Sequence, residues 1–337
     1  MILLCAAIVW TVANNPTSWA AEKPENDGSN VATETLPRQD DTEFGVQKTS
    51  DIQFCDHSPQ INGADESCDL YLPLPARDAG SGGGASNQQN ATSNADPQPC
   101  WPVVLVVHGG GWATGTKWTM DRHARQLAKN GFAVVSINYR LAPTSKFPDQ
   151  VDDVRSALVW ITEHAETYSL DTDRVGLYGY SAGGHLVSLV ATLADEPWSS
   201  VRQTTSWPKD DARWQKIPKI RAVCIGGPPT DFRNLPLDNT ALSFFLGGSR
   251  RERPDVYTAA SPIVYTSPTD PPFQIIHGEA DGIVPVDNAK DFHQALVKSN
   301  VPSTLHTLPG KGHLMAFISP QLTQWMLGFF EEQLSKR

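Results

Sequence analysis

The chain has 337 residues, 39% of them hydrophobic, and a formal net charge of −10 at pH 7. This length and apolar content suffice for one large α/β domain or two small ones. No basic patch stands out in the sequence, so we expect no nucleic-acid partner.

Residues 1–20 are expected to form a secretory signal peptide. Residues 2–12 are mostly apolar, a run too short to span a bilayer, and small residues precede a cleavage site after Ala20. Cys5 lies too early for a lipoprotein cysteine, so no stable membrane anchor is expected. The protein is therefore predicted to be secreted or periplasmic.

The acidic excess lies in the N-terminal quarter of the chain. Residues 21–100 carry 14 acidic and 4 basic side chains, whereas residues 101–337 carry 23 of each. A charged stretch with few apolar side chains cannot bury enough surface to order itself. We therefore expect an acidic disordered linker over 21–43 and one folded domain over 44–337, with a flexible low-complexity insertion at 77–99.

Short apolar runs predict eight strands, in chain order 51–55, 68–72, 103–107, 133–138, 175–178, 222–225, 273–277 and 303–307. Helical spacing of apolar residues lies between several of these runs, most clearly at 121–131 and 149–168. A hairpin followed by alternating strands and helices predicts an α/β fold: a mostly parallel twisted sheet with helices on both faces and an N-terminal antiparallel hairpin.

Four cysteines follow the predicted signal peptide. None belongs to a Cys-x-x-Cys pair, so we expect no metal site. Cys55 and Cys68 end and begin the strands of the predicted hairpin, and our hypothesis is a disulfide between them, with a bridge from Cys100 to either as the alternative. Cys224 lies within a predicted strand and is expected to be a buried thiol.

The strongest motif is the run Gly-Tyr-Ser-Ala-Gly at 179–183, between a predicted strand and an apolar helix. It matches the G-x-S-x-G turn that exposes a nucleophilic serine above a sheet. The sharpness of this turn requires small residues two positions before and after Ser181. The sequence therefore predicts Ser181 as a nucleophile, against the alternative of a glycine-rich turn with a capping serine.

A serine nucleophile needs a base, and the base needs an acid to orient it. His313 follows the last predicted strand in a glycine-rich loop, whereas His306 lies inside that strand. Asp281 follows the strand before it, with Glu279 and Asp287 as alternatives. We predict the triad Ser181, Asp281 and His313, a chain order typical of α/β-hydrolases.

The run His-Gly-Gly-Gly-Trp at 108–112 follows the strand at 103–107. Attack on a carbonyl places negative charge on its oxygen, which backbone N–H groups stabilise. A side chain on Gly110 or Gly111 would block that approach, so we predict an oxyanion hole formed by Gly110, Gly111 and Ala182. Since backbone donors hold the charge, we expect neither a metal nor a cofactor, and His108 is expected to fix the loop.

The segment 226–262 is expected to lie near the active site, because it follows a strand at the catalytic edge of the sheet. The tryptophan-rich stretch 195–219 connects a helix to the next strand and is expected at the opposite edge. Residues predicted to line the substrate pocket are Trp112, Tyr180, Phe232 and Phe244, with Leu235 and Phe245 as further candidates.

The motifs HGGGW, NYRLAP, GYSAGGHL, HGEADGIVP and GKGH together resemble those of hormone-sensitive-lipase-like esterases. They are still more similar to the neighbouring carboxylesterase group that includes bifunctional xylan/feruloyl esterase-like (BD-FAE) proteins. The lipase-like branch usually has Asp before the serine, where this chain has Tyr180. The resemblance covers roughly residue 50 to the end and implies an α/β-hydrolase fold over 44–337.

These features predict a secreted serine carboxylesterase that hydrolyses short-acyl esters through an acyl-enzyme, with a small-molecule or carbohydrate ester as substrate. No long apolar lid is evident in the sequence, so acetyl to butyryl esters are expected to be preferred over long-chain lipids. The alternatives are a prolyl-oligopeptidase-like serine peptidase and a catalytically inactive α/β-hydrolase that acts as a binding module.

Overall fold

In the computed structural model, the described residues are 44–55, 66–74, 100–238 and 240–335. The predicted signal peptide at 1–20, the linker at 21–43 and the insertion at 77–99 lie outside them. Eight strands of the described residues form one sheet in the order β1-β2-β4-β3-β5-β6-β7-β8. Antiparallel pairing joins β1 to β2 and β2 to β4, and the other strands pair in parallel. The predicted fold class is confirmed.

The strands are β1 (Gly45–Gln53), β2 (Ser67–Leu74), β3 (Trp101–Val107), β4 (Ala133–Ile137), β5 (Leu170–Tyr180), β6 (Ile220–Gly226), β7 (Phe273–Gly278) and β8 (Ser303–Leu308). The longer helices are α1 (Asp121–Lys129), α2 (Asp149–Glu163), α4 (Ala182–Thr192), α8 (Asp287–Lys298) and α10 (Pro320–Leu334). The short helices are α3 (Ala165–Tyr168), α5 (Trp198–Val201), α6 (Ser243–Leu246), α7 (Pro254–Ala259) and α9 (His313–Phe317). Single 3-10 turns are η1 (Lys117–Met120), η2 (Ala212–Lys216) and η3 (Pro262–Tyr265).

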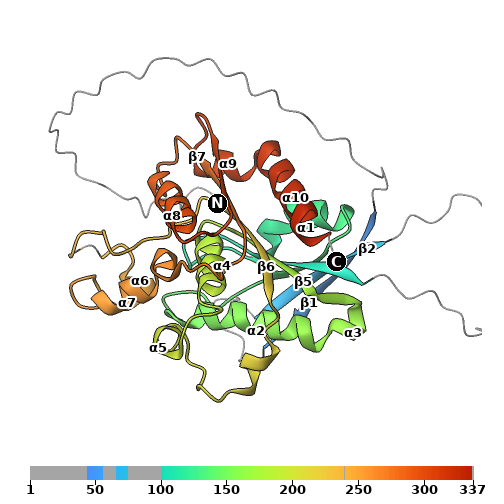
Figure 1. Ribbon diagram of the computed structural model, residues 1–337, viewed down its shortest axis with the longest axis horizontal. Coiled ribbons are helices and arrows are strands. Elements are labelled where there is room, and N and C mark those ends of the chain that lie inside the picture. Colours follow the sequence, from blue (N-terminus) through green and yellow to red (C-terminus); the bar gives the residue numbers. More distant parts are fainter. Residues whose placement is uncertain (1–43, 56–65, 75–99, 239, 336–337) are drawn as a thin grey trace, which may run out of the picture.

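Helices cover both faces of the sheet, with α2 and α4 on one side and α1 and α10 on the other (Figure 1). Strand β3 shows the consequence for the sequence. Val103, Leu105 and Val107 belong to the core cluster on the α2–α4 face, whereas Val104 and Val106 belong to the cluster on the α1–α10 face. All five are fully buried. A parallel strand covered on both faces is apolar along its whole length, which explains the unbroken run in the sequence.

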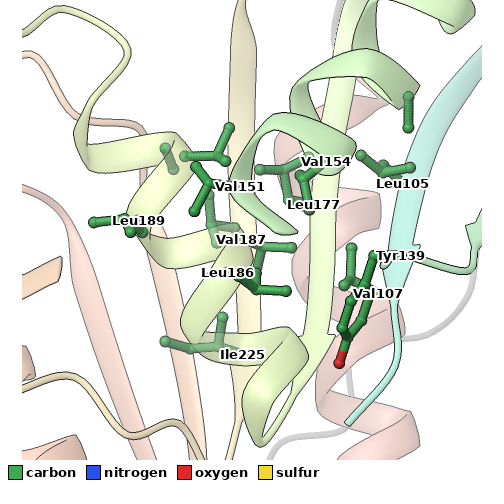
Figure 2. Packing of buried hydrophobic residues seen from close by; sticks show 14 of the residues in the cluster. Leu105, Val107, Tyr139, Val151, Val154, Leu177, Leu186, Val187, Leu189 and Ile225 are labelled. Atoms are coloured by element: carbon green, nitrogen blue, oxygen red, sulfur yellow. The ribbon is translucent and has the colours of Figure 1, made fainter. Parts of the chain in front are cut away.

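The larger core cluster packs α2 and α4 next to each other against one face of the sheet (Figure 2). Leu186 and Val187 of α4 contact this cluster together with Val151 and Val154 of α2. Each of these side chains is fully buried. Helix α4 is therefore fixed along its length, and so is the residue from which it starts.

Strand β1 begins at Gly45, six residues before the strand we predicted at 51–55. It is an edge strand, and most of its residues are exposed or half-buried, so its sequence lacks an apolar run. The pairing with β2 shifts between Thr49 and Ile52, where Asp51 adopts a φ of 59°. Such an irregularity disrupts the alternation from which a strand is recognised.

The predicted disulfide between Cys55 and Cys68 is absent among the described cysteines. The register places Ile52, not Cys55, opposite Cys68. Three residues of extended chain span about 10 Å, which exceeds the Cα–Cα distance of a disulfide. Cys68 is fully buried, and burial raises the pKa of its thiol to about 12. The hairpin prediction is confirmed, and the bridge prediction is wrong.

Cys224 is fully buried in β6, as expected. No helix in the described part of the chain is long and apolar enough to cross a membrane.

Candidate active site

Ser181 occupies the turn between β5 and α4, with φ 55° and ψ −121°. This backbone conformation is rare for a residue with a side chain. A Cβ on Gly179 would lie 2.3 Å from the Gly183 carbonyl oxygen, and one on Gly183 would lie 2.1 Å from the Val107 carbonyl oxygen. Both contacts are with backbone, which cannot give way. The two glycines of the motif are therefore required by the sharpness of the turn.

His313 and Asp281 are joined directly. His313 Nδ1 lies 2.5 Å from Asp281 Oδ2, and the Asp281 side chain is fully buried. Asp281 follows β7 and His313 follows β8, and these parallel neighbours end at the same edge of the sheet. The Nδ1 contact leaves Nε2 of the imidazole for a proton from a nucleophile.

The Asp281 carboxylate accepts further hydrogen bonds. The backbone N–H groups of Ile283 and Val284 each donate to Oδ1 at 2.9 Å. Burial alone would raise the pKa of Asp281, but the hydrogen bonds from His277 and His313 outweigh it and hold that pKa below its usual range. The acid is therefore ionised wherever a neutral imidazole can act as a base.

His277 is a second imidazole on the same carboxylate, which the sequence patterns did not indicate. Its Nε2 lies 3.2 Å from Asp281 Oδ2 and 2.9 Å from the Val284 carbonyl oxygen. A carbonyl oxygen only accepts, so Nε2 carries the proton. The buried Nδ1 has no partner among the described residues. His277 thus holds the same carboxylate oxygen that His313 contacts.

Contacts made by Ser181 and the residues around it place Ser181 next to the Asp281–His313 pair. Tyr180 donates its hydroxyl to the His313 carbonyl oxygen at 2.5 Å, and the two ring centroids are 5.2 Å apart. Ser181 N donates to the Gly226 carbonyl oxygen at 2.7 Å. A Cβ on Gly227 would lie 2.9 Å from His313 Cε1. Within the described residues the Ser181 hydroxyl makes no hydrogen bond, and such contacts are often loose before substrate binds.

The alternatives to Asp281 and His313 lie elsewhere. Glu279 is exposed and accepts a hydrogen bond from Thr307 Oγ1 at 2.8 Å. Asp287 is exposed and pairs with Lys290. The His306 ring stacks on Trp325 at 4.4 Å. The structure therefore brings together the three residues of the predicted triad, whose catalytic roles remain a prediction.

The loop after β3 approaches Ser181 through Gly109, a position that the sequence patterns did not single out. A Cβ there would lie 2.9 Å from the Tyr180 carbonyl oxygen and 3.2 Å from Ser181 Cβ. Gly110 has a φ of 124°, and its carbonyl accepts hydrogen bonds from the N–H groups of Ala113 and Thr114. The loop is thus a closed turn.

The predicted oxyanion donors are the N–H groups of Gly110, Gly111 and Ala182. Within the described part of the chain, none of the three donates a hydrogen bond. Unpaired backbone donors beside a nucleophile are the arrangement that stabilises an oxyanion. Their role stays a prediction, which this geometry fits.

Two buried histidines hold the loop. His108 Nδ1 donates to the Gly109 carbonyl oxygen at 2.7 Å, and its ring stacks on Tyr139 at 4.3 Å. Trp112 Nε1 donates to His185 Nδ1 at 3.2 Å, and His185 Nε2 donates to the Ala260 carbonyl oxygen at 2.7 Å. Burial lowers the pKa of both imidazoles to about 4, so both are neutral near pH 7.

Three of the four residues predicted to line the substrate pocket are nearly buried. Trp112, Tyr180 and Phe232 are at most 5% exposed. The Trp112 ring stacks on Phe245, with ring centroids 4.4 Å apart and ring planes at 5°, and forms an edge contact with Phe232. Packing against neighbouring rings thus uses much of the Trp112 surface, and the place of these residues in a substrate pocket stays a prediction. Tyr180 supports His313. Phe244 is half-buried and packs against the core, and its place in the pocket lining stays a prediction.

Exposed apolar side chains instead follow the triad residues in the chain. Ile283 is 53% exposed, Leu314 67% and Met315 51%. They lie within two residues of Asp281 or His313.

Because the serine turn and the Asp–His pair lie at one edge of this parallel sheet, the fold is that of an α/β-hydrolase. A family model described as BD-FAE matches residues 92–296, more than half of the chain. The chain belongs to this family, as its motifs indicated.

The relatives and solved structures that this chain resembles include proteins named as esterases. "Probable carboxylic ester hydrolase LipM" of Mycobacterium tuberculosis is 32% identical over 214 residues, covering 61% of this chain and 49% of the relative. The chain spans about half the length of the curated relatives it matches. A truncated carbohydrate esterase from gut microbiota superposes with a TM-score of 0.69 at 22% identity, covering 88% of this chain and 99% of that one. A bifunctional GH43-CE protein of Bacteroides eggerthii superposes with a TM-score of 0.68 at 26% identity, covering 85% of this chain and 35% of that one.

Proposed function

We propose that this protein is a serine carboxylesterase that hydrolyses short-acyl esters, acylated carbohydrates among them, through an acyl-enzyme. The observation that carries the proposal is the buried Asp281–His313 contact of 2.5 Å beside the strained Ser181 turn. Membership of the BD-FAE family and relatives named as esterases support it.

In this mechanism Ser181 Oγ attacks the carbonyl carbon of the ester while His313 Nε2 takes its proton. The negative charge on the carbonyl oxygen is stabilised by the N–H groups of Gly110, Gly111 and Ala182, each worth about 3–4 kcal/mol. The bond to the alcohol breaks as His313 returns the proton to the leaving oxygen. Water then attacks the acyl-enzyme, His313 takes its proton, and the carboxylic acid and free serine are released.

The surface beside the predicted triad favours short acyl groups. A long acyl chain gains roughly 0.8 kcal/mol for each buried methylene only where a channel receives it. Ile283, Leu314 and Met315 are each more than half exposed, so they offer a shallow apolar contact rather than a channel. This geometry supports short-acyl substrates.

The test is ester hydrolysis by the wild type and by Ser181→Ala across nitrophenyl esters of increasing acyl length. We expect kcat/KM to peak between acetyl and butyryl and the variant to lose at least about 10⁴-fold, with an unchanged circular dichroism spectrum. Near wild-type turnover by Ser181→Ala would contradict the mechanism. Rates that rise steadily beyond eight carbons would contradict the substrate class.

A further inference from the structure

A cavity of about 580 Å³ opens at the edge of the sheet opposite Ser181. Leu193, directly after the last residue of α4, contributes to its wall, as do α5, η2 and the start of β6. Helix α4 has 11 residues between the elbow and this point. At 1.5 Å per residue the cavity lies about 16 Å from Ser181, so it is separate from the triad.

Two half-buried tryptophans form one corner of this cavity. The ring centroids of Trp198 and Trp214 lie 6.1 Å apart, with the ring planes at 83°. Val190 and Leu193 add aliphatic wall. An indole ring offers a large apolar face with a negative quadrupole, against which the C–H face of a ring-shaped ligand can pack.

Arg155 contributes a buried cation to the lining. It is 3% exposed, and its guanidinium carbon lies 5.3 Å from the centroid of the Trp214 ring. Nη1 donates to Asp152 Oδ1 and to the Thr204 carbonyl, and Nη2 donates to Thr204 Oγ1. A guanidinium has five donors. Among the described residues, Nε and one hydrogen of Nη2 are therefore left for a further acceptor.

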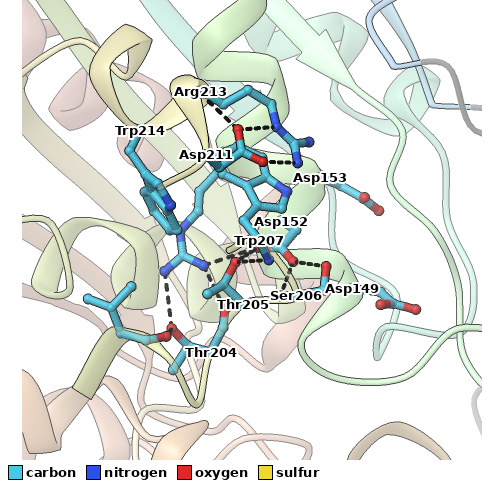
Figure 3. A network of polar contacts seen from close by, with 12 residues as sticks. Asp149, Asp152, Asp153, Thr204, Thr205, Ser206, Trp207, Asp211, Arg213 and Trp214 are labelled. Carbon is cyan, nitrogen blue, oxygen red and sulfur yellow. Dashed lines mark hydrogen bonds and ion pairs between the residues drawn. The ribbon is translucent and has the colours of Figure 1, made fainter. Parts of the chain in front are cut away.

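Hydrogen bonds between protein groups hold the wall of the cavity in place. Asp152 accepts hydrogen bonds from Thr205 Oγ1 at 2.6 Å and from the N–H and hydroxyl groups of Ser206 at 2.7 Å each (Figure 3). These contacts fix the segment before Trp214 to α2. A preformed site spends little binding free energy on ordering its own residues.

The charges at the cavity argue for a neutral ligand. Asp195 and Glu196 are balanced by Lys209 and Lys219, and Arg155 is paired with Asp152. An anion site would carry an excess of positive charge, and a hydrocarbon would leave these polar groups without partners. A sugar ring combines an apolar C–H face with hydroxyl groups that both donate and accept.

We propose that this cavity binds a neutral sugar unit of an oligosaccharide or polysaccharide. The site goes beyond the proposed esterase activity, since it requires no acyl group and does not touch the triad. A polymer held there keeps other parts of the same chain near the catalytic edge, which raises their effective concentration.

The experiment is calorimetric titration of the full-length Ser181→Ala variant with unacylated cellohexaose, xylohexaose and mannohexaose. We expect at least one of these to bind at one site, and Trp198→Ala in the same background to weaken that binding at least tenfold. Trp198→Phe keeps part of the aromatic face and is expected to lose less. Trp325→Ala is the matched control. Trp325 of α10 is also a half-buried tryptophan, and its ring stacks on His306.

The proposal is overturned if no neutral hexasaccharide binds, or if Trp198→Ala, shown to be folded by its melting curve, binds as tightly as its parent. Binding restricted to uronate-bearing oligosaccharides would also overturn it, because the ligand would then be an anion. Sugar binding by a protein that hydrolyses no ester would refute the proposed function and leave this inference standing.

Discussion

The two edges of the sheet, which α4 connects, differ in how completely their polar groups are paired. At the catalytic edge Ser181 has a strained backbone, and the N–H groups of the three predicted oxyanion donors donate to no described residue. At the opposite edge Asp152 accepts hydrogen bonds from Arg155, Thr205 and Ser206. Unpaired groups are available to a substrate, whereas paired groups hold the chain in place. We therefore expect changes at the first edge to reduce activity and changes in the Asp152 network at the second to reduce stability.

After Ser181→Ala, the largest effect is expected from Asp281→Asn. The amide can orient His313 only in the wrong tautomer and cannot stabilise the imidazolium, so kcat should fall by about 10³–10⁴-fold. The loss should be smaller than that of Ser181→Ala. Kinetics on a nitrophenyl acetate substrate measure it.

Asp287→Asn is the matched control, because this exposed aspartate lies six residues along the chain and pairs only with Lys290 in the described structure. Its kcat should equal that of the wild type. If the two variants lost activity equally, Asp281 would not be the acid of the triad.

A feature of the fold or the site could be predicted from the sequence where its physical cause lies within a few residues of the chain. The elbow at Ser181 follows from steric limits within a few residues, and the unbroken apolar run of β3 follows from its burial on both faces. The triad follows from where neighbouring strands end. The burial of Trp112 could not be predicted, because it depends on Phe245, which is distant in the chain. The register that separates Cys55 from Cys68 depends on an irregularity at Asp51.

At the opposite edge, Asp152→Asn should mainly affect stability. It leaves the buried Arg155 cation without its anion, so the free energy of unfolding should fall by about 3–5 kcal/mol. Asp211→Asn is the control, since its partner Arg213 is partly exposed and such a pair contributes at most about 1 kcal/mol. Denaturant titration of both variants checks this, and equal losses would show that the Asp152 network does not anchor this edge.

Acidification should weaken the fold through its buried histidines. Burial lowers the pKa of His108, His123 and His185 to about 4, against about 6.5 in an unfolded chain. Below pH 6.5 the unfolded state binds more protons than the folded state, so stability falls as pH falls toward 4. Each histidine contributes up to about 1.4 kcal/mol per pH unit. Urea unfolding between pH 7.5 and 4.5 measures the slope, and constant stability over this range would contradict the prediction.

The smallest effect is expected from metal removal. Groups of three or more metal-ligating side chains are absent from the described ranges, and the proposed mechanism holds the oxyanion with backbone donors. Dialysis against EDTA should therefore leave kcat/KM on short-acyl esters unchanged. A loss that added Zn²⁺ or Ca²⁺ restores would require a different account of the catalytic edge.

The most direct test of the catalytic edge is covalent labelling with a fluorophosphonate, followed by mass spectrometric mapping of the modified peptide. We expect one label per molecule, attached to Ser181 Oγ, with labelling slowed strongly in His313→Gln and unaffected in His306→Gln. A label on another residue, or no label on a folded protein, would contradict the claim that Ser181 is the nucleophile.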